Sequence, residues 1–418
     1  MKKKLNVILI KTVIFLLLIN YQVVTVFFKD AFLLKYLRDI ALSLLLVYVL
    51  VCRRKISYNE TLIFIGVLIT SILVAAFQTA DLGVTLVFAR RYLFPILFLY
   101  ALQNSKELDK ETCRDLLNFF LTLLAILGVW GIIQAHILGP SFLIKMGYPT
   151  IFSNVFKKIT LRHSFYFGNL GIQRVVSTLS NSNLFALILG PSLILYWMDQ
   201  EKLLISKAEK VKFIIVLVTY ILTFSRANFL AMLIVMITIA WKYIPQKRVI
   251  YLSLFLATIG VFVMFLVEGN SGIVHKFLGW VVRSLNFTDP SAGARFGIWE
   301  TAWESVQKNP FGIGFGKVGS WAEFANVRDM YICENSYLAM ALDLGISGTV
   351  FYAMFMFSLL IKIMKKHSMN PRLSIAGVSI CVYMMICFLF SNHIYDMEAV
   401  SSVYFLIALI LTCLNMEK

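Results

Sequence analysis

Two stretches, ARFGIWETAWESVQKNPFGIGFG (294–316) and ENSYLAMALDLG (334–345), interrupt a sequence that is otherwise dominated by long apolar runs. The chain has 418 residues, of which 60% are hydrophobic and 15% are charged. This composition excludes an ordinary soluble domain and a disordered chain, and it indicates an integral membrane protein. A membrane protein that keeps residues 268–344 outside the bilayer must use them for something, and we expect that use to be chemistry.

The apolar runs on either side of this interruption are long enough to cross a bilayer as helices, which takes roughly 20 mainly apolar residues. We count about twelve candidates of this length. The alternating pattern of a membrane β-barrel is absent, so we predict an all-α polytopic membrane protein with a single domain over 1–418. The candidate spans are 5–28, 32–52, 61–77, 85–103, 115–138, 183–198, 211–224, 227–244, 249–267, 345–364, 373–391 and 396–415.

The net charge of +17 would suggest nucleic-acid binding in a soluble protein, but the positions of the charges explain it better. More than half of the 39 basic residues fall in loops and termini on one side of the predicted bundle, whereas the short loops 78–83 and 391–398 have none. The positive-inside rule then predicts that both termini are cytoplasmic, and nucleic acid is not an expected partner. The first apolar run is too long for a signal peptide, so we interpret it as a retained span.

Two outer loops are predicted, 139–182 and the longer 268–344. In the longer loop we expect a helix at the membrane surface over 293–307, capped by Ser291 and carrying an apolar stripe of Phe296, Trp299, Trp303 and Val306. The glycines of 312–316 (GIGFG) lack the preceding strand and following helix of a dinucleotide-binding loop. We expect them to allow a tight backbone path beside a ligand.

Neither a metal site nor a bound cofactor is predicted. The six cysteines contain no CxxC pair, and the five histidines are not spaced as ligands.

Several arginines are candidates for binding an anion. Arg90 and Arg91 lie in the outer half of the fourth predicted span, where an arginine costs roughly 2.5–3.5 kcal/mol at the bilayer centre. They either extend to the interface or face an internal cavity and bind phosphate. Arg226 lies in a very short outer turn, which favours anion binding over a salt bridge to a neighbouring loop.

Other polar residues allow two interpretations. Arg174 precedes a cluster of serines, threonine and asparagines (177–183) that can either cap a helix or bind a sugar. Arg38 and Asp39 are expected to neutralise each other. Glu334 and Asn335 stand where the chain re-enters the membrane. Glu334 is a candidate general base and Asn335 a candidate to orient a hydroxyl, although a carboxylate there can also simply stabilise a helix N-terminus.

Four motifs, taken in order, carry a resemblance to a known family. They are RVVSTLSNSNLFA (174–186), LTFSRANFLAML (222–233), ARFGIWETAW with NPFGIGFG (294–316) and ENSYLAMALDLGISG (334–348). Together they resemble the O-antigen ligase and Wzy-type polysaccharide polymerase superfamily. The resemblance implies a metal-independent membrane glycosyltransferase of the GT-C type, in which Arg295, Arg226 and Arg174 engage the pyrophosphate of a lipid-linked sugar donor.

One position departs from the ligase pattern. The ligase branch has His-Asn-Ser where this chain has Glu334-Asn335-Ser336. The glutamate preserves a potential base but favours the polymerase branch. Asp343, His393 and Asp396 are alternative bases on the same side.

We therefore expect an enzyme that polymerises polyprenyl-pyrophosphate-linked repeat units of O-antigen, capsule or exopolysaccharide at the outer face of the bacterial plasma membrane, with inversion. A ligase acting on another acceptor and a lipid-linked glycan flippase or other transporter are the alternatives. The expected partners are the lipid bilayer, the lipid-linked oligosaccharide, and flippase and chain-length regulator proteins.

Overall fold

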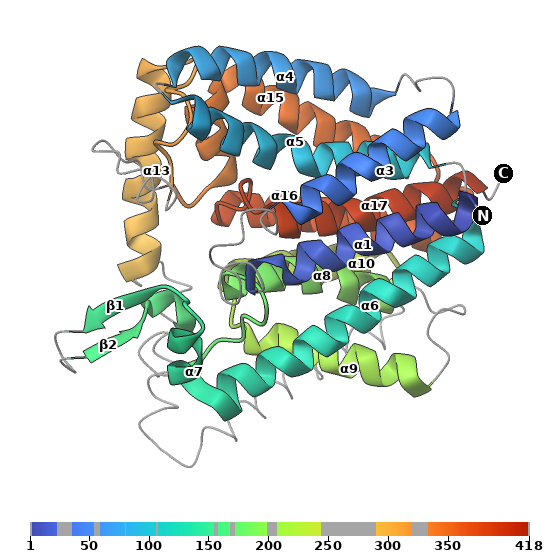
Figure 1. Cartoon of the computed structure of the whole chain (residues 1–418), viewed down its shortest axis with the longest axis horizontal. Helices are drawn as coiled ribbons and strands as arrows, with labels where there is room; N and C mark the ends of the chain where they lie inside the picture. Colours follow the sequence, from blue (N-terminus) through green and yellow to red (C-terminus); the bar gives the residue numbers. More distant parts are fainter. Residues whose placement is uncertain are drawn as a thin grey trace.

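The long helices lie side by side in one bundle (Figure 1). In this view both ends of the chain lie at one end of the bundle, and helix α13 lies at the other. Which end faces the cytoplasm stays a prediction. The structure is a computed structural model, and it describes residues 2–22, 36–53, 59–79, 81–105, 108–153, 158–167, 172–198, 207–243, 290–319 and 333–416.

Six helices in these ranges are long and apolar enough to cross a membrane, which confirms the predicted helical membrane protein. They are α4 (Glu60–Gln78), α5 (Leu82–Asn104), α6 (Lys110–Ile132) with its continuation, α15 (Ser336–Met364), α16 (Pro371–Phe390) and α17 (Met397–Met416). The shorter or less apolar helices beside them are α1 (Lys2–Gln22), α3 (Leu37–Arg53), α8 (Ser182–Met198), α9 (Lys207–Leu222) and α10 (Arg226–Tyr243).

The predicted number of twelve spans and the GT-C-like architecture stay predictions. The candidate span 249–267 lies outside the described residues. Each of the other predicted spans overlaps an observed helix.

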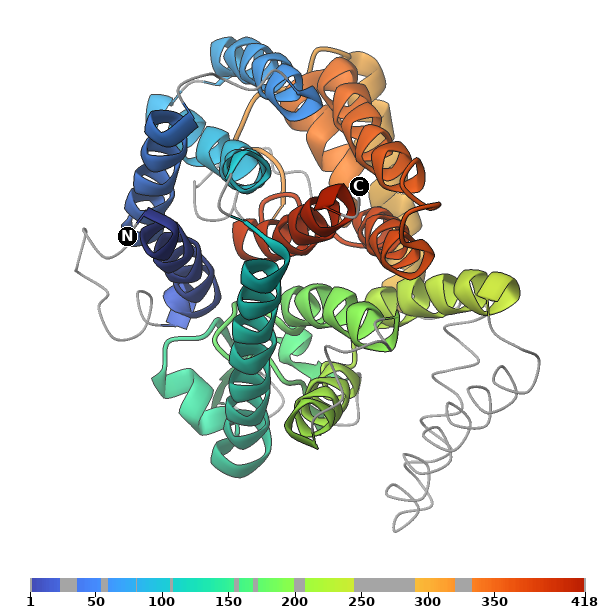
Figure 2. The same ribbon diagram turned by 90° about the vertical axis from the view of Figure 1, so that its right-hand side faces the viewer.

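Helix α17 forms the centre of the bundle (Figure 2). It packs against α5, α8, α16 and α6, and its side chains Tyr404 and Phe405 are fully buried. Around it, α15 packs against α4 and α16, and α10 packs against α16. The helices that carry the candidate site residues are therefore held by a common core.

Asparagine and aspartate side chains fix the starts of several helices. Asn59 accepts a hydrogen bond from the backbone N–H of Leu62 in α4, and Asn370 accepts one from Leu373 in α16. Such caps satisfy N–H groups that have no partner inside the helix. They allow the chain to turn sharply between spans.

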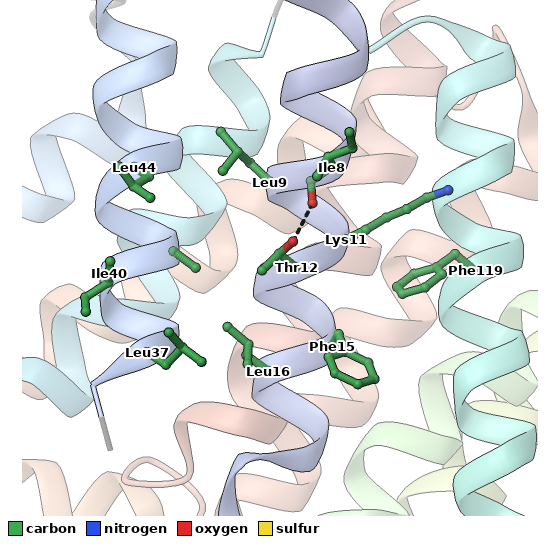
Figure 3. A pocket seen from close by; sticks show the side chains of 11 residues that line it. Ile8, Leu9, Lys11, Thr12, Phe15, Leu16, Leu37, Ile40, Leu44 and Phe119 are labelled. Atoms are coloured by element: carbon green, nitrogen blue, oxygen red, sulfur yellow. Dashed lines mark hydrogen bonds between the residues drawn. The ribbon is translucent and has the colours of Figure 1, made fainter. Parts of the chain in front are cut away.

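A groove of about 520 Å³ lies between α1 and α3 and reaches Phe119 of α6 (Figure 3). Its lining is mostly aliphatic. Lys11 lines it too, and its ammonium group pairs with Asp115 at 2.8 Å. A surface of this kind suits lipid contact.

The predicted outer loop 139–182 has structure of its own. After α6 the chain forms a π-helical turn, η2 (Ile133–Leu138), and α7 (Gly139–Lys145). Two small antiparallel pairs follow: Thr150 lies opposite Leu161 in the first, and Tyr166 lies opposite Gln173 in the second. These elements are β1 (Thr150–Ser153), β2 (Lys158–Leu161), η3 (His163–Phe165), β3 (Tyr166–Phe167) and β4 (Ile172–Gln173).

Helix α13 (Pro290–Lys308) confirms the helix that was predicted over 293–307. The cap prediction was wrong, because Ser291 lies inside the helix and Pro290 begins it. A proline is well suited to the first helical position, where its missing N–H costs nothing.

The predicted apolar stripe of α13 is divided between two faces. Val306 is buried, together with Ala302, whereas Phe296 and Trp303 are 52% and 50% exposed. The helix contacts α15, and it runs across the ends of the bundle helices (Figure 1). Its exposed rings are therefore placed to lie along a membrane surface.

Candidate functional site

Helix α15 enters the bundle earlier than predicted. The span was expected at 345–364 and the outer loop at 268–344, but α15 begins at Ser336, with Asn335 as its cap. Gly345, at φ 79° and ψ 172°, interrupts the helix. The apolar pattern therefore predicted the part of α15 that follows Gly345. The part before Gly345 begins at the polar motif ENS.

The glycines of 312–316 take the tight backbone path that was predicted, and they pack closely against other segments of the protein; a ligand beside them stays a prediction. A Cβ at Gly312 would lie 2.8 Å from the carbonyl oxygen of Asp343, and one at Gly314 would lie 2.8 Å from that of Gln78. Both glycines have φ near +90°. Their freedom lets this segment pack on the interruption of α15 and on the end of α4.

Arg174 follows β4 and is held by three uncharged acceptors. Its Nε donates to the carbonyl oxygen of Thr223 at 2.7 Å, and its Nη1 donates to that of Ser164 at 3.0 Å. Its Nη2 donates to Oδ1 of Asn183 at 2.6 Å. In the described part of the chain no carboxylate pairs with this guanidinium.

Arg226 and Arg295 lie near enough to Arg174 to act on it electrostatically, and we call these three residues the arginine cluster. Burial, with Arg226 and then Arg295 nearby, lowers the pKa of Arg174 to about 10, which leaves it charged at neutral pH. Arg226 is the first residue of α10, after a turn in which Phe224 adopts φ 46°. Arg295 comes from α13. Three separate segments therefore contribute positive charge to one place.

A polar network behind Arg174 was not predicted. Asn183 Oδ1 also accepts from Ser225 Oγ at 2.8 Å, and Asn228 Nδ2 donates to that same hydroxyl at 2.8 Å. Tyr383 of α16 donates to Asn228 Oδ1 at 2.7 Å. Isolated polar residues in apolar runs are the sequence signal for such a network.

The polar segment 177–183 mainly supports structure. Asn181 caps α8 by accepting from Leu184 N–H at 2.9 Å. Ser177 donates to the carbonyl oxygen of Leu127 at 2.6 Å, and Thr178 donates to that of Leu18 at 2.6 Å. Of the two interpretations, these contacts favour helix capping and loop packing.

Glu334 faces the arginine cluster. Its Oε2 accepts from Arg295 Nε at 2.5 Å, and the two side chains are 48% and 24% exposed. Asn335 Oδ1 accepts from the N–H groups of Tyr337 and Leu338, so this oxygen caps α15. The predicted roles of Glu334 as base and of Asn335 toward a hydroxyl stay predictions.

Ser336 connects this motif to the segment before α17. Its hydroxyl donates to the carbonyl oxygen of Ser391 at 2.8 Å and accepts from the backbone N–H of His393 at 2.8 Å. Cys333 is buried, which raises the pKa of its thiol to about 12. The backbone on both sides of Glu334 is therefore held in place.

Arg90 and Arg91 belong to a different group of charges. Arg90 Nε donates to Asp39 Oδ1 at 2.6 Å, and its guanidinium lies over the ring of Tyr36. Arg91 donates to the carbonyl oxygen of Tyr395 at 3.0 Å. Their predicted role in substrate binding stays a prediction, and these contacts favour a structural one.

The expectation that Arg38 and Asp39 neutralise each other was wrong. Arg38 pairs with Glu398 of α17, whereas Asp39 pairs with Arg90 of α5. Adjacent residues on a helix point in different directions, so each finds a partner on a different neighbouring helix.

The three alternative bases are largely buried. Asp343 is fully buried, and its Oδ2 accepts from the hydroxyls of Tyr395 at 2.7 Å and Tyr92 at 3.0 Å. His393 Nδ1 lies 3.0 Å from Asp396 Oδ2, and burial raises the pKa of Asp396. Glu334, nearly half exposed and beside Arg295, is better placed to meet a substrate.

In a comparison with known families, residues 211–353 match the family model described as O-antigen ligase. No curated protein matches the chain at a significant level. The family match confirms the resemblance to the O-antigen ligase and Wzy-type superfamily and includes Arg226, Arg295 and Glu334, whereas Arg174 precedes it. The family indicates a membrane enzyme that transfers glycans, as a ligase or a polymerase.

Proposed function

We propose that this relative of the O-antigen ligases and Wzy-type polymerases polymerises oligosaccharide repeats carried on polyprenyl pyrophosphate, at the outer face of a bacterial plasma membrane. The bundle of apolar helices supports the membrane location. The arginine cluster and Glu334, gathered at one end of that bundle, support the chemistry.

The observation that carries this proposal is the environment of Arg174. A guanidinium that donates only to uncharged oxygens keeps its full positive charge, and here it lies near two further arginines. Such a group of like charges attracts an anion. A pyrophosphate suits the site, because several guanidinium groups can share its charged oxygens.

The proposed reaction needs two kinds of group, and both are present. A hydroxyl oxygen at the non-reducing end of one repeat attacks the anomeric carbon of the growing chain, and the carbon–oxygen bond to pyrophosphate breaks. The electron pair of that bond leaves with polyprenyl pyrophosphate, while the hydroxyl proton passes to Glu334. The arginine cluster stabilises the departing negative charge, and a direct displacement inverts the anomeric carbon.

The choice of polymerase over ligase rests on one residue. Glu334 stands where the ligase pattern has histidine, and its carboxylate is nearly half exposed. The description of the matched family favours the ligase as the second candidate. Both candidates use the same donor, so the acceptor distinguishes them.

Incubation of the purified full-length protein with a polyprenyl-pyrophosphate-linked oligosaccharide tests the proposal. A ladder of lipid-linked products of increasing length is the expected result. Transfer to a different added acceptor, in one step and without a ladder, would identify a ligase. Movement of labelled lipid-linked sugar across liposomes without any elongation would identify a transporter.

A further inference from the structure

We infer that Glu334 is the resident counter-ion of Arg295, and that the pyrophosphate of the donor displaces it from this guanidinium. The inference rests on the proposed function and adds a step to it: binding of the donor releases the Glu334 carboxylate from its ion pair.

The geometry of the ion pair places Glu334 in competition with a phosphate group for Arg295. Glu334 Oε2 accepts from Arg295 Nε at 2.5 Å, so one edge of the guanidinium is directed at the carboxylate. The same guanidinium edge that holds Glu334 is also an edge that a phosphate oxygen would use.

The exposure of the pair indicates that a ligand can open it. The side chains of Arg295 and Glu334 are 24% and 48% exposed, whereas those of the pair Arg38–Glu398 are 10% and 17% exposed. An exposed ion pair contributes little stability, because water screens it. Arg38 and Glu398 are thus placed as a permanent pair, and Arg295 and Glu334 as an exchangeable one.

Only the Glu334 side chain needs to move. Asn335 caps α15 directly after it, and Ser336 is bonded to the backbone of Ser391 and His393. On the other side, the thiol of Cys333 donates to the carbonyl oxygen of Asn335 at 3.2 Å. The exchange is then a rotation of one carboxylate on a fixed backbone.

Electrostatics decides which anion Arg295 prefers. The Glu334 carboxylate brings one negative charge to Arg295. A pyrophosphate brings more than one charge, and Arg174, whose acceptors are all uncharged, attracts it as well. Pyrophosphate therefore displaces the carboxylate from Arg295.

Binding of inorganic pyrophosphate to the full-length protein in detergent tests the inference. Glu334→Gln removes the competing charge, so this variant should bind pyrophosphate about 2–5-fold more tightly than the wild type. Glu300→Gln, an exposed glutamate on the same helix as Arg295, should bind as the wild type does. Equal or weaker binding by Glu334→Gln would overturn the inference.

A second measurement uses the wild-type protein, in case the variant does not fold. Carbodiimide-driven coupling of an amine labels accessible carboxylates, and mass spectrometry locates the label. Pyrophosphate should increase labelling of Glu334 and leave Glu300 and Glu304 unchanged. Unchanged or reduced labelling at Glu334 would contradict the exchange.

The two proposals fail in different ways. If neither the wild type nor Arg174→Ala binds pyrophosphate, the proposed function itself is wrong. If the wild type binds pyrophosphate, Arg174→Ala weakens binding and Glu334→Gln does not strengthen it, only the exchange is wrong.

Discussion

Two groups of arginines lie at the same end of this bundle, and they have different partners. Arg38 and Arg90 each pair with a carboxylate on another helix. Arg174, in contrast, donates to three uncharged oxygens and lies near Arg226 and Arg295. The first group is neutralised by carboxylates of the protein, whereas Arg174 donates only to uncharged oxygens and therefore favours an anion from outside.

The comparison shows that the hydrogen-bond and ion-pair partners of an arginine in a membrane protein indicate whether its role is structural or functional. All of these residues are costly to place near a bilayer, so each of them needs a reason. For the paired group the reason is structural, since α3, α5 and α17 are held together by it. For the arginine cluster the proposed reason is the donor's pyrophosphate.

The largest effect is expected in the paired group. Arg38→Gln leaves the carboxylate of Glu398 largely buried without its partner, which should cost about 3–5 kcal/mol of stability. Thermal unfolding in detergent measures this as a lower midpoint. Arg38→Gln with Glu398→Gln should recover much of the loss, because no charge is then left unpaired. An unchanged unfolding midpoint in Arg38→Gln alone would show that the Arg38–Glu398 pair does not stabilise the bundle.

The next effect separates the two groups by activity. Arg174→Ala should lower elongation by about 10²–10³-fold, the usual loss for one donor to a developing negative charge. Arg90→Gln is the matched control, and properly inserted Arg90→Gln protein should elongate within about threefold of the wild type. A ladder assay compares them at equal protein concentration. A similar loss of elongation in both variants would indicate that Arg90 also binds the substrate, as its position in the sequence suggested.

A smaller effect tests geometry within the arginine cluster. Arg295→Lys keeps the charge but loses the forked donors, so elongation should fall about tenfold, equivalent to one charged hydrogen bond of roughly 1.5 kcal/mol. Arg372→Lys, at the start of α16 and at the opposite end of the bundle, should have no effect. Near-normal elongation by Arg295→Lys would show that only its charge matters.

The features predictable from the sequence are those that depend on neighbouring residues along the chain. Hydropathy located the spanning helices, because a helix that crosses lipid must be apolar over its length. The helix of 290–308 was predictable from its spacing. Arg226 was singled out because it lies in a very short turn, and its role in binding an anion stays a prediction.

The choice of partners was not predictable from the sequence. Arg38 pairs with Glu398, which lies 360 positions away, because α3 and α17 begin at the same level of the bundle. The surfaces of apolar helices are alike, so the sequence does not show which helices are neighbours. For the same reason the contact between the glycines of 312–316 and the interruption at Gly345 could not be foreseen.

The smallest effect concerns the polar network that positions Arg174. Tyr383→Phe removes the hydroxyl that donates to Asn228 Oδ1, and thus one bond in the series that ends at Asn183 and Arg174. We expect a loss of about 1 kcal/mol in stability and a two- to threefold fall in elongation.

A matched control distinguishes this effect from ordinary destabilisation. The hydroxyls of Tyr352 and Tyr404 are 2.8 Å apart in the bundle core, in a contact separate from the network of Arg174. Tyr352→Phe should therefore lower the unfolding midpoint as much as Tyr383→Phe does but leave elongation unchanged. If both variants lose the same activity, Tyr383 acts through stability alone. If only Tyr383→Phe loses activity, the uncharged partners of Arg174 do more than solvate it, because they hold its guanidinium in the orientation that an anion requires.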